Sequence, residues 1–288
     1  MPHPNMRHPN KICALPNRAV IAITGPDWAG FLKGLCTAHI ELLKDEVGQS
    51  QFHRLHYGAF LRPQGKLICD VLLHAVGVDD IRLDVPWVMR DELLSKLNMY
   101  RLRARVSIAA LDVPVSVSFA GDLPDDFMAD PRQSIIDSKF GFAYSPREAT
   151  AYEHEWRQFR YQNGLSDPGV DFAADALYAI DANLDLLNAI DFHKGCYVGQ
   201  ELTSRMKRRG QIKNRILPFR YTGAPPQAGA EVLNGDKRAG EVLAAADGYG
   251  LALMRIDRRE GDLTSQQTAL KLIIPDWLAT ALPAIAVE

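Results

Sequence analysis

Three apolar stretches separated by short turns constrain the fold most strongly, because they predict strands that run back and forth in one antiparallel sheet. The first, HYGAFL, is followed by RPQG, in which Pro63 and Gly65 occupy the second and fourth positions typical of a type I turn. The second, KLICDVLLHAV, leads through VGVDD to the third, IRLDV. Helical patterns lie on both sides of this meander. The mixture favours an α+β fold over a parallel α/β sheet.

Other elements are predicted from local patterns. We expect a strand over residues 18–23, a helix capped by Asp27, a helix over residues 86–98 and a strand in RARVSIAAL. The stretch SPREATAYEHEWRQFRYQNG predicts a helix that ends at Gly164. The first twenty residues contain no apolar stretch suited to a signal peptide, and we expect them to be a loose lead-in.

The composition changes after Gly210. ILPFRYTG, AEVLNGDKRAGEVL with its Asn-Gly hairpin turn, and YGLALMRI predict short strands joined by glycine-rich turns. This pattern is typical of a small closed or nearly closed β-domain. The length of 288 residues suggests about two domains, with three small ones as the alternative.

Charge and cysteine content exclude several classes of protein. The net charge of -2 gives no overall attraction to nucleic acid, so such binding would need a local patch. No run is long enough for a membrane span, and we expect no membrane partner. The four cysteines lack zinc or cluster spacing, which predicts no permanent metal or iron–sulfur cluster and suits a reducing, cytoplasmic setting. They are Cys13, Cys36, Cys69 and Cys196.

The stretch KGCYVGQE, residues 194–201, is the strongest candidate for a functional site. Gly195 and Gly199 would let the backbone turn sharply and approach a ligand. A helix predicted to start near Gln200 and to end at Gly210 would point free N–H groups at an anion. The P-loop pattern is not matched, so a nucleotide phosphate is disfavoured.

The side chains of the same stretch suggest two kinds of chemistry. Lys194 would pair with a carboxylate or lower the pKa of Cys196 and so raise its thiolate fraction. Gln200 and Glu201 supply the amide and carboxylate that can recognise the edge of a heterocycle. The alternative is a glycine-rich linker between domains in which Cys196 is buried as a small apolar residue.

Two further features stand apart from this stretch. Residues 205–215, RMKRRGQIKNR, contain six Lys or Arg and predict a solvated face, a patch for RNA or DNA phosphates, or a grip on a polycarboxylate. Asp70 lies in an apolar strand, so its carboxylate must be paired, exposed at an edge or functional.

KGCYVGQE, preceded by LDLLNAIDF and followed by a basic run broken by glycine, resembles the signature of the YgfZ family. These are folate-binding proteins of iron–sulfur cluster maintenance, related in fold to the aminomethyltransferase (T-protein) of the glycine cleavage system. Weaker similarity covers most of the chain, in FLKGLCTAHI, GKLICDVLL, YRLRARVSI and AGEVLAAADGYGLALMRID.

The resemblance implies two α+β lobes around a folate-sized opening and a C-terminal β-barrel. The lobes would occupy residues 12–204, with the first lobe discontinuous and the second at about residues 50–120. The barrel would occupy residues 211–288. Our reading of a meander, a returning helix and a late all-β region is compatible with this arrangement.

The resemblance also implies a ligand and a role. The ligand would be tetrahydrofolate, including polyglutamated forms, whose anionic tail would meet Lys194, Arg205 or the basic run. The role would be assembly or repair of iron–sulfur clusters in client enzymes, including those that modify tRNA, with Cys196 as a redox-active or transiently bonding thiol. The residues carried over are Lys194, Gly195, Cys196, Tyr197, Gly199, Gln200 and Glu201.

The chain departs from the T-protein pattern where that family places carboxylates. An acidic pair is replaced by Cys69 and Asp70, and the R-x-E-x-G-L pattern that contacts the pterin becomes RYQNGL, with Gln162 in place of glutamate. T-proteins also lack the signature cysteine. Because acid–base catalysis needs a placed ionisable group, these departures argue against aminomethyl transfer as the main activity. Aminomethyl or other one-carbon transfer with Asp70, and RNA binding through residues 205–215, are the alternatives.

Overall fold

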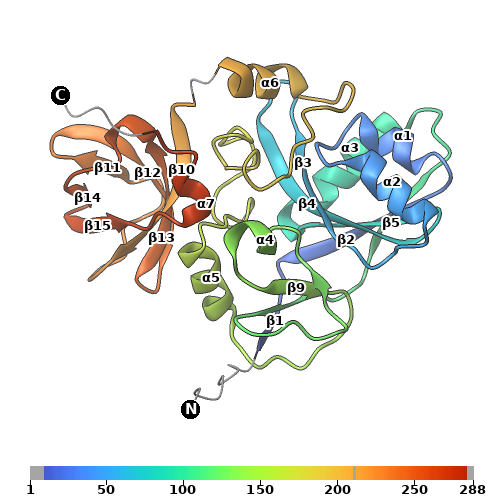
Figure 1. Cartoon of the computed structure of the whole chain (residues 1–288), viewed down its shortest axis with the longest axis horizontal. Coiled ribbons are helices and arrows are strands. Elements are labelled where there is room, and N and C mark those ends of the chain that lie inside the picture. The colour runs from blue at the N-terminus through green and yellow to red at the C-terminus, as the bar shows by residue number, and fades with distance from the viewer. Residues whose placement is uncertain (1–9, 210–211, 284–288) are drawn as a thin grey trace, which may run out of the picture.

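The computed structural model describes residues 10–209 and 212–283, whose strands form a five-stranded sheet, a four-stranded sheet and a closed barrel (Figure 1). The barrel lies at one end of the molecule, and the five-stranded sheet with its helices lies at the other. The predicted α+β fold with a C-terminal barrel is confirmed. No helix of the described residues is long and apolar enough to cross a membrane.

The five-stranded sheet has the order β3-β4-β5-β2-β6, and every pairing in it is antiparallel. The predicted meander is confirmed as β3-β4-β5, and the turn before β4 is closed by the Gly65 N–H, which donates to Arg62 O at 2.8 Å. β2 lies well before residue 50 but belongs here, because it pairs with β5. The strands are β2 (Arg18–Thr24), β3 (His56–Leu61), β4 (Leu67–Gly77), β5 (Asp80–Pro86) and β6 (Ser107–Leu111).

Both faces of this sheet are covered, which is why β4 reads as a continuous apolar run. Alternate residues enter different cores: Cys69 and Val71 pack with the helices, whereas Leu72 packs with the residues of the four-stranded sheet. The helices are α1 (Trp28–Lys33), α2 (Ile40–Gly48), the 3-10 turn η1 (Trp87–Met89) and α3 (Arg90–Arg101).

The four-stranded sheet joins the start of the chain to strands about a hundred residues later. β1 pairs with β7, so Lys11 lies opposite Phe119. The expectation of a loose lead-in is therefore wrong for β1, because Cys13 is buried in this core. The elements of this lobe are β1 (Lys11–Ala14), β7 (Ser116–Phe119), β8 (Met128–Ala129), β9 (Phe140–Ala143), α4 (Gln133–Ile136) and α5 (Glu153–Gln162).

Two local predictions need correction, and a third is confirmed at one end of its helix. Asp27 does not cap α1 with its side chain; the carboxylate instead accepts hydrogen bonds from Arg105. The helix expected from residue 86 begins as α3 at Arg90, because Pro86 still pairs within the sheet. α5 is shorter than expected at its start, but Gly164, with φ +71°, terminates it as predicted.

The barrel closes in the order β10-β13-β12-β11-β14-β15, as the late run of short strands indicated. The predicted Asn-Gly turn joins β11 to β12 and places Gly235 at φ +57°. The elements are β10 (Asn214–Tyr221), β11 (Glu231–Asn234), β12 (Lys237–Ala246), β13 (Tyr249–Arg255), η2 (Ile256–Arg258), β14 (Leu263–Ser265), β15 (Thr268–Leu272) and α7 (Asp276–Ala279).

Residues 165–199 connect the lobes to the barrel without a helix or a named strand. Their apolar side chains are nevertheless buried, among them Ile180, Leu184 and Ala189. α6 (Gln200–Arg209) follows and lies between the barrel and β3 in Figure 1. The predicted start of this helix is confirmed, whereas its predicted end at Gly210 lies outside the described residues.

Candidate functional site

The signature, residues 194–201, packs against the segment that follows α1. The Lys194 ammonium donates hydrogen bonds to the carbonyl oxygens of Cys36 and Ala38, the second at 3.1 Å. The Val198 N–H donates to Gly34 O at 3.1 Å. The signature is therefore fastened to the lobe of the five-stranded sheet at two points.

The hydrogen bonds of the Lys194 side chain lie within the chain. Burial lowers the pKa of its ammonium group, which also lies 4.9 Å from the ring centre of Tyr197. No hydrogen bond or ion pair of the described residues joins it to a carboxylate or to the Cys196 thiol. Within the described residues its hydrogen bonds go to backbone carbonyls, which accept from an ammonium equally well. Lys194 is an internal tether.

Asp191 organises the turn that enters the signature, a role that the sequence reading missed. Its Oδ1 accepts the N–H groups of His193 and Lys194 at 2.8 and 3.1 Å. Its own N–H donates to Thr37 O at 2.8 Å. Aspartate bonded to the backbone two residues ahead is a common turn former, so DFHKG carries a usable signal.

Packing requires glycine at one of the two glycine positions of the signature but not at the other. Gly199 has φ +84°, and a Cβ there would lie 2.6 Å from Arg62 O and 2.8 Å from Leu61 Cβ. Only glycine allows this close approach between the start of α6 and the turn before β4. A Cβ on Gly195 would meet no atom within 4 Å. Packing of the described residues therefore does not require glycine at position 195.

A hollow of about 770 Å³ opens beside the signature, and we call it the signature hollow. One face of α6 supplies part of its wall, through side chains spaced four, seven and eight positions after Gln200. The lining residues are Phe192, His193, Cys196, Tyr197, Gln200, Glu201, Ser204, Lys207 and Arg208.

Four predicted residues therefore meet in one place: Cys196, Tyr197, Gln200 and Glu201. The other predicted residues do not line this hollow; they are Lys194, Gly195, Gly199, Arg205, Gln162 and Asp70. Burial, followed by the charge of Asp191, raises the pKa of Tyr197 to about 12. Tyr197 Oη makes no hydrogen bond within the described residues.

Cys196 is the exposed cysteine of the chain, whereas Cys13, Cys36 and Cys69 are buried. Burial raises the pKa of the Cys13 thiol to about 11, and it also raises the pKa values of Cys36 and Cys69. These three thiols stay protonated and shielded. The alternative in which Cys196 is a buried apolar residue is wrong.

Much of the basic run is neutralised within the chain. Arg205 pairs with Glu201 at 2.6 Å, one turn earlier in α6. Lys207 and the buried Arg215 both pair with Asp185, at 3.0 and 2.5 Å. Asp185 thus ties α6 to the first strand of the barrel, which the local charge pattern had not indicated.

Asp70 lies in a separate, buried network between the two α+β lobes. Tyr57 Oη donates to Asp70 Oδ2 at 3.2 Å, and Arg18 Nη1 lies 3.6 Å from Asp70 Oδ1. The same Arg18 pairs with Asp84 and Asp167, at 2.7 and 3.4 Å. Asp70 is therefore paired, one of the outcomes that its place in an apolar strand predicted.

A second hollow, of about 590 Å³, lies between the two α+β lobes. It includes Tyr57 and Asp130, together with His56, whose Nε2 lies 2.7 Å from Glu46 Oε2. Gln162 lines neither hollow; it is exposed at the end of α5. Within the described residues, no group of three or more His, Cys, Asp or Glu is arranged to hold a metal ion.

Comparisons with known proteins agree with this architecture. Residues 213–280 match the family model described as CAF17, C-terminal beta-barrel domain. Over 93% of this chain and 85% of the other, aminomethyltransferase T of the glycine cleavage system from Bartonella henselae superposes with a TM-score of 0.73 at 13% identity. That likeness shows the fold.

Curated relatives extend over nearly the whole chain. The mitochondrial iron-sulfur cluster assembly factor IBA57 of Mus musculus is 29% identical over 93% of this chain and 85% of its own length. That of Homo sapiens is 28% identical over 92% and 85%. The Mycosarcoma maydis homolog is 27% identical over 76% of this chain and 59% of its own length.

These relatives correct two expectations. They are IBA57 proteins, so the YgfZ resemblance holds at the coarser level of related iron–sulfur assembly factors with a T-protein-like fold. They are mitochondrial, which contradicts the predicted cytoplasmic setting; unpaired cysteines indicate a reducing environment without specifying the compartment. The chain is thus similar to iron–sulfur cluster assembly factors and has the aminomethyltransferase T fold with a C-terminal β-barrel.

Proposed function

We propose that this protein assists the assembly of iron–sulfur clusters in client proteins and that Cys196 is its working thiol. The curated relatives named above support the role. The observation that carries the assignment to Cys196 is its exposure at the signature hollow, while the three other cysteines are buried. A thiolate is the ligand that binds the iron of such clusters.

The surrounding residues hold this thiol in place. The Lys194 tether, the Asp191 turn and the close approach at Gly199 fix the backbone on both sides of Cys196. Arg208, which makes no ion pair within the described residues, adds positive charge to the same hollow. A cluster with thiolate ligands is anionic, so this charge favours it as a transient cargo shared with a partner.

The role of Cys196 is tested by complementation in a strain that lacks the chain. We expect the wild type and Cys13→Ala to restore the activity of iron–sulfur enzymes, and Cys196→Ala to fail at equal protein level. Cys13 is the matched control because it is a thiol in the same chain, buried and not part of the lining of the signature hollow. Full restoration by Cys196→Ala would remove the thiol from the mechanism.

Tetrahydrofolate is the ligand that we propose for the signature hollow, on the strength of the signature resemblance. Phe192 and Tyr197 offer aromatic walls, and the Gln200 amide offers a polar group for a pterin ring. Arg208 would meet the anionic tail, and its charge favours polyglutamated forms. When bound, tetrahydrofolate would supply a reduced pterin able to carry one-carbon units.

Calorimetric titration of tetrahydrofolate under anaerobic conditions tests this assignment. We expect Gln200→Leu to weaken binding about tenfold, because one polar contact contributes about 1.4 kcal/mol. Gln162→Leu should bind like the wild type. The opposite result, with only Gln162→Leu impaired, would move the ligand away from the signature. Lys194→Ala is unsuitable here, because it would release the tether as well.

Client enzymes that modify tRNA are part of the same proposal. We expect nucleosides made by iron–sulfur enzymes to fall in tRNA digests when Cys196 is replaced, while other modified nucleosides stay constant. Aminomethyl transfer has no structural support at Asp70, whose carboxylate is buried beside Arg18. RNA binding through residues 205–215 is disfavoured by the ion pairs of Arg205, Lys207 and Arg215.

A further inference from the structure

We propose that the loop between α3 and β6, with the groove beside it, docks an acidic segment of a partner protein that carries apolar anchor residues. We call residues 99–106 the arginine loop. Leu102 is 86% exposed and Met99 is 65% exposed, whereas most large apolar side chains of this lobe are buried. A single exposed apolar residue is ordinary on a protein surface, but Leu102 also lines the apolar groove beside the loop, and exposed apolar surface of that kind marks interaction sites.

Hydrogen bonds hold the arginine loop around Leu102. Leu102 has φ 44°, a conformation that a leucine rarely adopts, at the point where α3 ends. The loop is closed by the Ala104 N–H, which donates to Arg101 O at 2.8 Å. Arg105 anchors it through three hydrogen bonds to Asp27, of which the backbone one is 2.8 Å. A strained residue held outward by a fixed loop is typical of a recognition element.

A groove of about 660 Å³ runs beside the loop, between it and α1, and we call it the α1 groove. Small and apolar side chains line most of it, with cations at its edge. The apolar and aromatic members are Pro26, Ala29, Phe31, Leu35, Tyr100, Leu102, Ala104 and Val198, and the cations are Lys44, Arg101 and Arg103. This lining suits apolar side chains of a partner.

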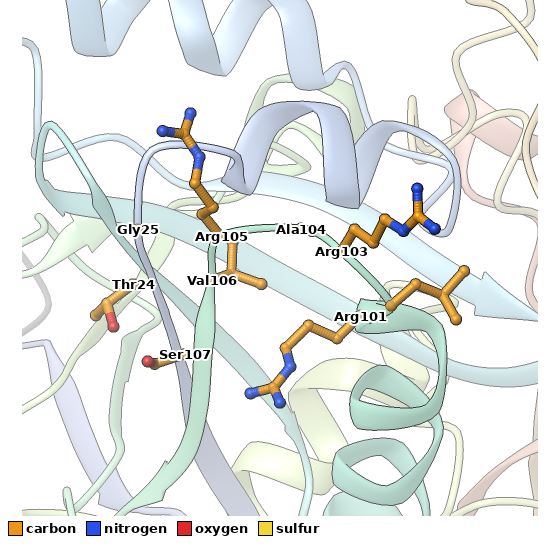
Figure 2. A pocket seen from close by; sticks show the side chains of 9 residues that line it. Thr24, Gly25, Arg101, Arg103, Ala104, Arg105, Val106 and Ser107 are labelled. Carbon is orange, nitrogen blue, oxygen red and sulfur yellow. The ribbon is translucent and has the colours of Figure 1, made fainter.

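Charge identifies the partner more closely. Lys44, Arg101 and Arg103 are exposed and make no ion pair within the part of the chain that the structure describes, whereas Arg105 is neutralised by Asp27. Figure 2 shows the guanidinium groups of Arg101, Arg103 and Arg105 directed to different sides of the loop. They do not converge on one phosphate-sized point. Dispersed cations around apolar residues match an acidic amphipathic segment of a protein.

The α1 groove adjoins the signature. Val198 lines the groove, and Cys196, two residues earlier, lines the signature hollow. Two residues span at most roughly 7 Å of backbone, so a segment docked in the groove lies close to the thiol. On the basis of the proposed function, this partner is an iron–sulfur client or assembly protein with such an acidic segment.

Photocrosslinking in the native host tests the docking surface. p-Benzoylphenylalanine is placed in the full chain at Leu102 or, as a control on the barrel, at the exposed Thr222. We expect crosslinks from position 102 to map by mass spectrometry to a protein segment rich in Asp and Glu with interspersed apolar residues. Crosslinks to RNA or lipid, or a yield no higher than that from position 222, would overturn the proposal.

Charge reversal makes the test specific. Arg101→Glu combined with Arg103→Glu should lower the crosslink yield about tenfold, because like charges would meet. Lys271→Glu, on the exposed surface of β15, should leave the yield unchanged. An unchanged yield in the double variant would overturn the docking surface. The crosslink should persist in Cys196→Ala, so loss of cluster assembly in that variant is distinguishable from loss of docking.

Discussion

Replacement of Lys194 by methionine tests the tether that places the signature. Methionine keeps the apolar stem but removes the two hydrogen bonds to Cys36 O and Ala38 O and the contact with the Tyr197 ring. A hydrogen bond to a charged group contributes about 1.5–3 kcal/mol, and a cation–π contact adds about 0.5–1 kcal/mol. The ammonium loses solvation on burial, which offsets part of this gain. We expect Lys194→Met to lower the free energy of unfolding by about 2–4 kcal/mol.

Urea unfolding at pH 7 measures this loss, with Lys33→Met as the control. Lys33 makes an exposed ion pair with Glu41, and such pairs add little to stability. Hydrogen exchange adds a local readout, because the Val198 N–H bonded to Gly34 O should exchange faster in Lys194→Met. A Lys194→Met protein as stable as Lys33→Met, with unchanged exchange at Val198, would refute the tether.

Three further predictions concern packing and titration. Gly199→Ala should lower the free energy of unfolding by about 2 kcal/mol or more, because of its positive φ and the 2.6 Å approach to Arg62 O; Gly195→Ala, measured in the same urea series, should have little effect. Burial lowers the pKa of His74 from 6.5 to about 3. The contribution of neutral His74 to the free energy of unfolding is therefore fully present above pH 6.5 and is lost as the pH falls towards 3. In His74→Phe, the decrease in the free energy of unfolding between pH 6.5 and pH 4 should be smaller than in the wild type by about 3 kcal/mol. A variant whose stability falls with acid as much as that of the wild type would contradict this. Burial raises the pKa of Asp181 from 3.8 to about 6, so the protonated carboxyl contributes stability below pH 3.8 that is lost as the pH rises through 6. Asp181→Asn should therefore make the free energy of unfolding less dependent on pH and stabilise the protein at pH 8. Urea unfolding at pH 4 and pH 8 checks this.

Local patterns were sufficient for elements whose partners are near in sequence. The strands β3, β4 and β5 follow one another, and the Gly65 and Gly235 turns carry their own signals. β1 was missed because its partner β7 lies about a hundred residues later and its four residues show no clear alternation. Alternation along a strand predicts a buried face but not which distant segment covers it.

The candidate site was predicted in its location but not in the division of roles. KGCYVGQE pointed to Cys196 and Gln200, which do line the signature hollow. The sequence could not show that Lys194 turns inward to backbone carbonyls, because carbonyl acceptors carry no sequence signature. Likewise, the run at residues 205–215 looked like a free cationic surface until Asp185, from twenty residues earlier, proved to be a shared partner.

Incorporation of radioactive iron into the iron–sulfur proteins of a strain that lacks this chain tests the proposed function most directly. We predict that incorporation falls without the chain, while total cellular iron stays constant. Wild type and Cys13→Ala should restore incorporation, and Cys196→Ala should not. Unchanged incorporation in the strain without the chain would contradict a role in cluster assembly, whatever the signature hollow binds.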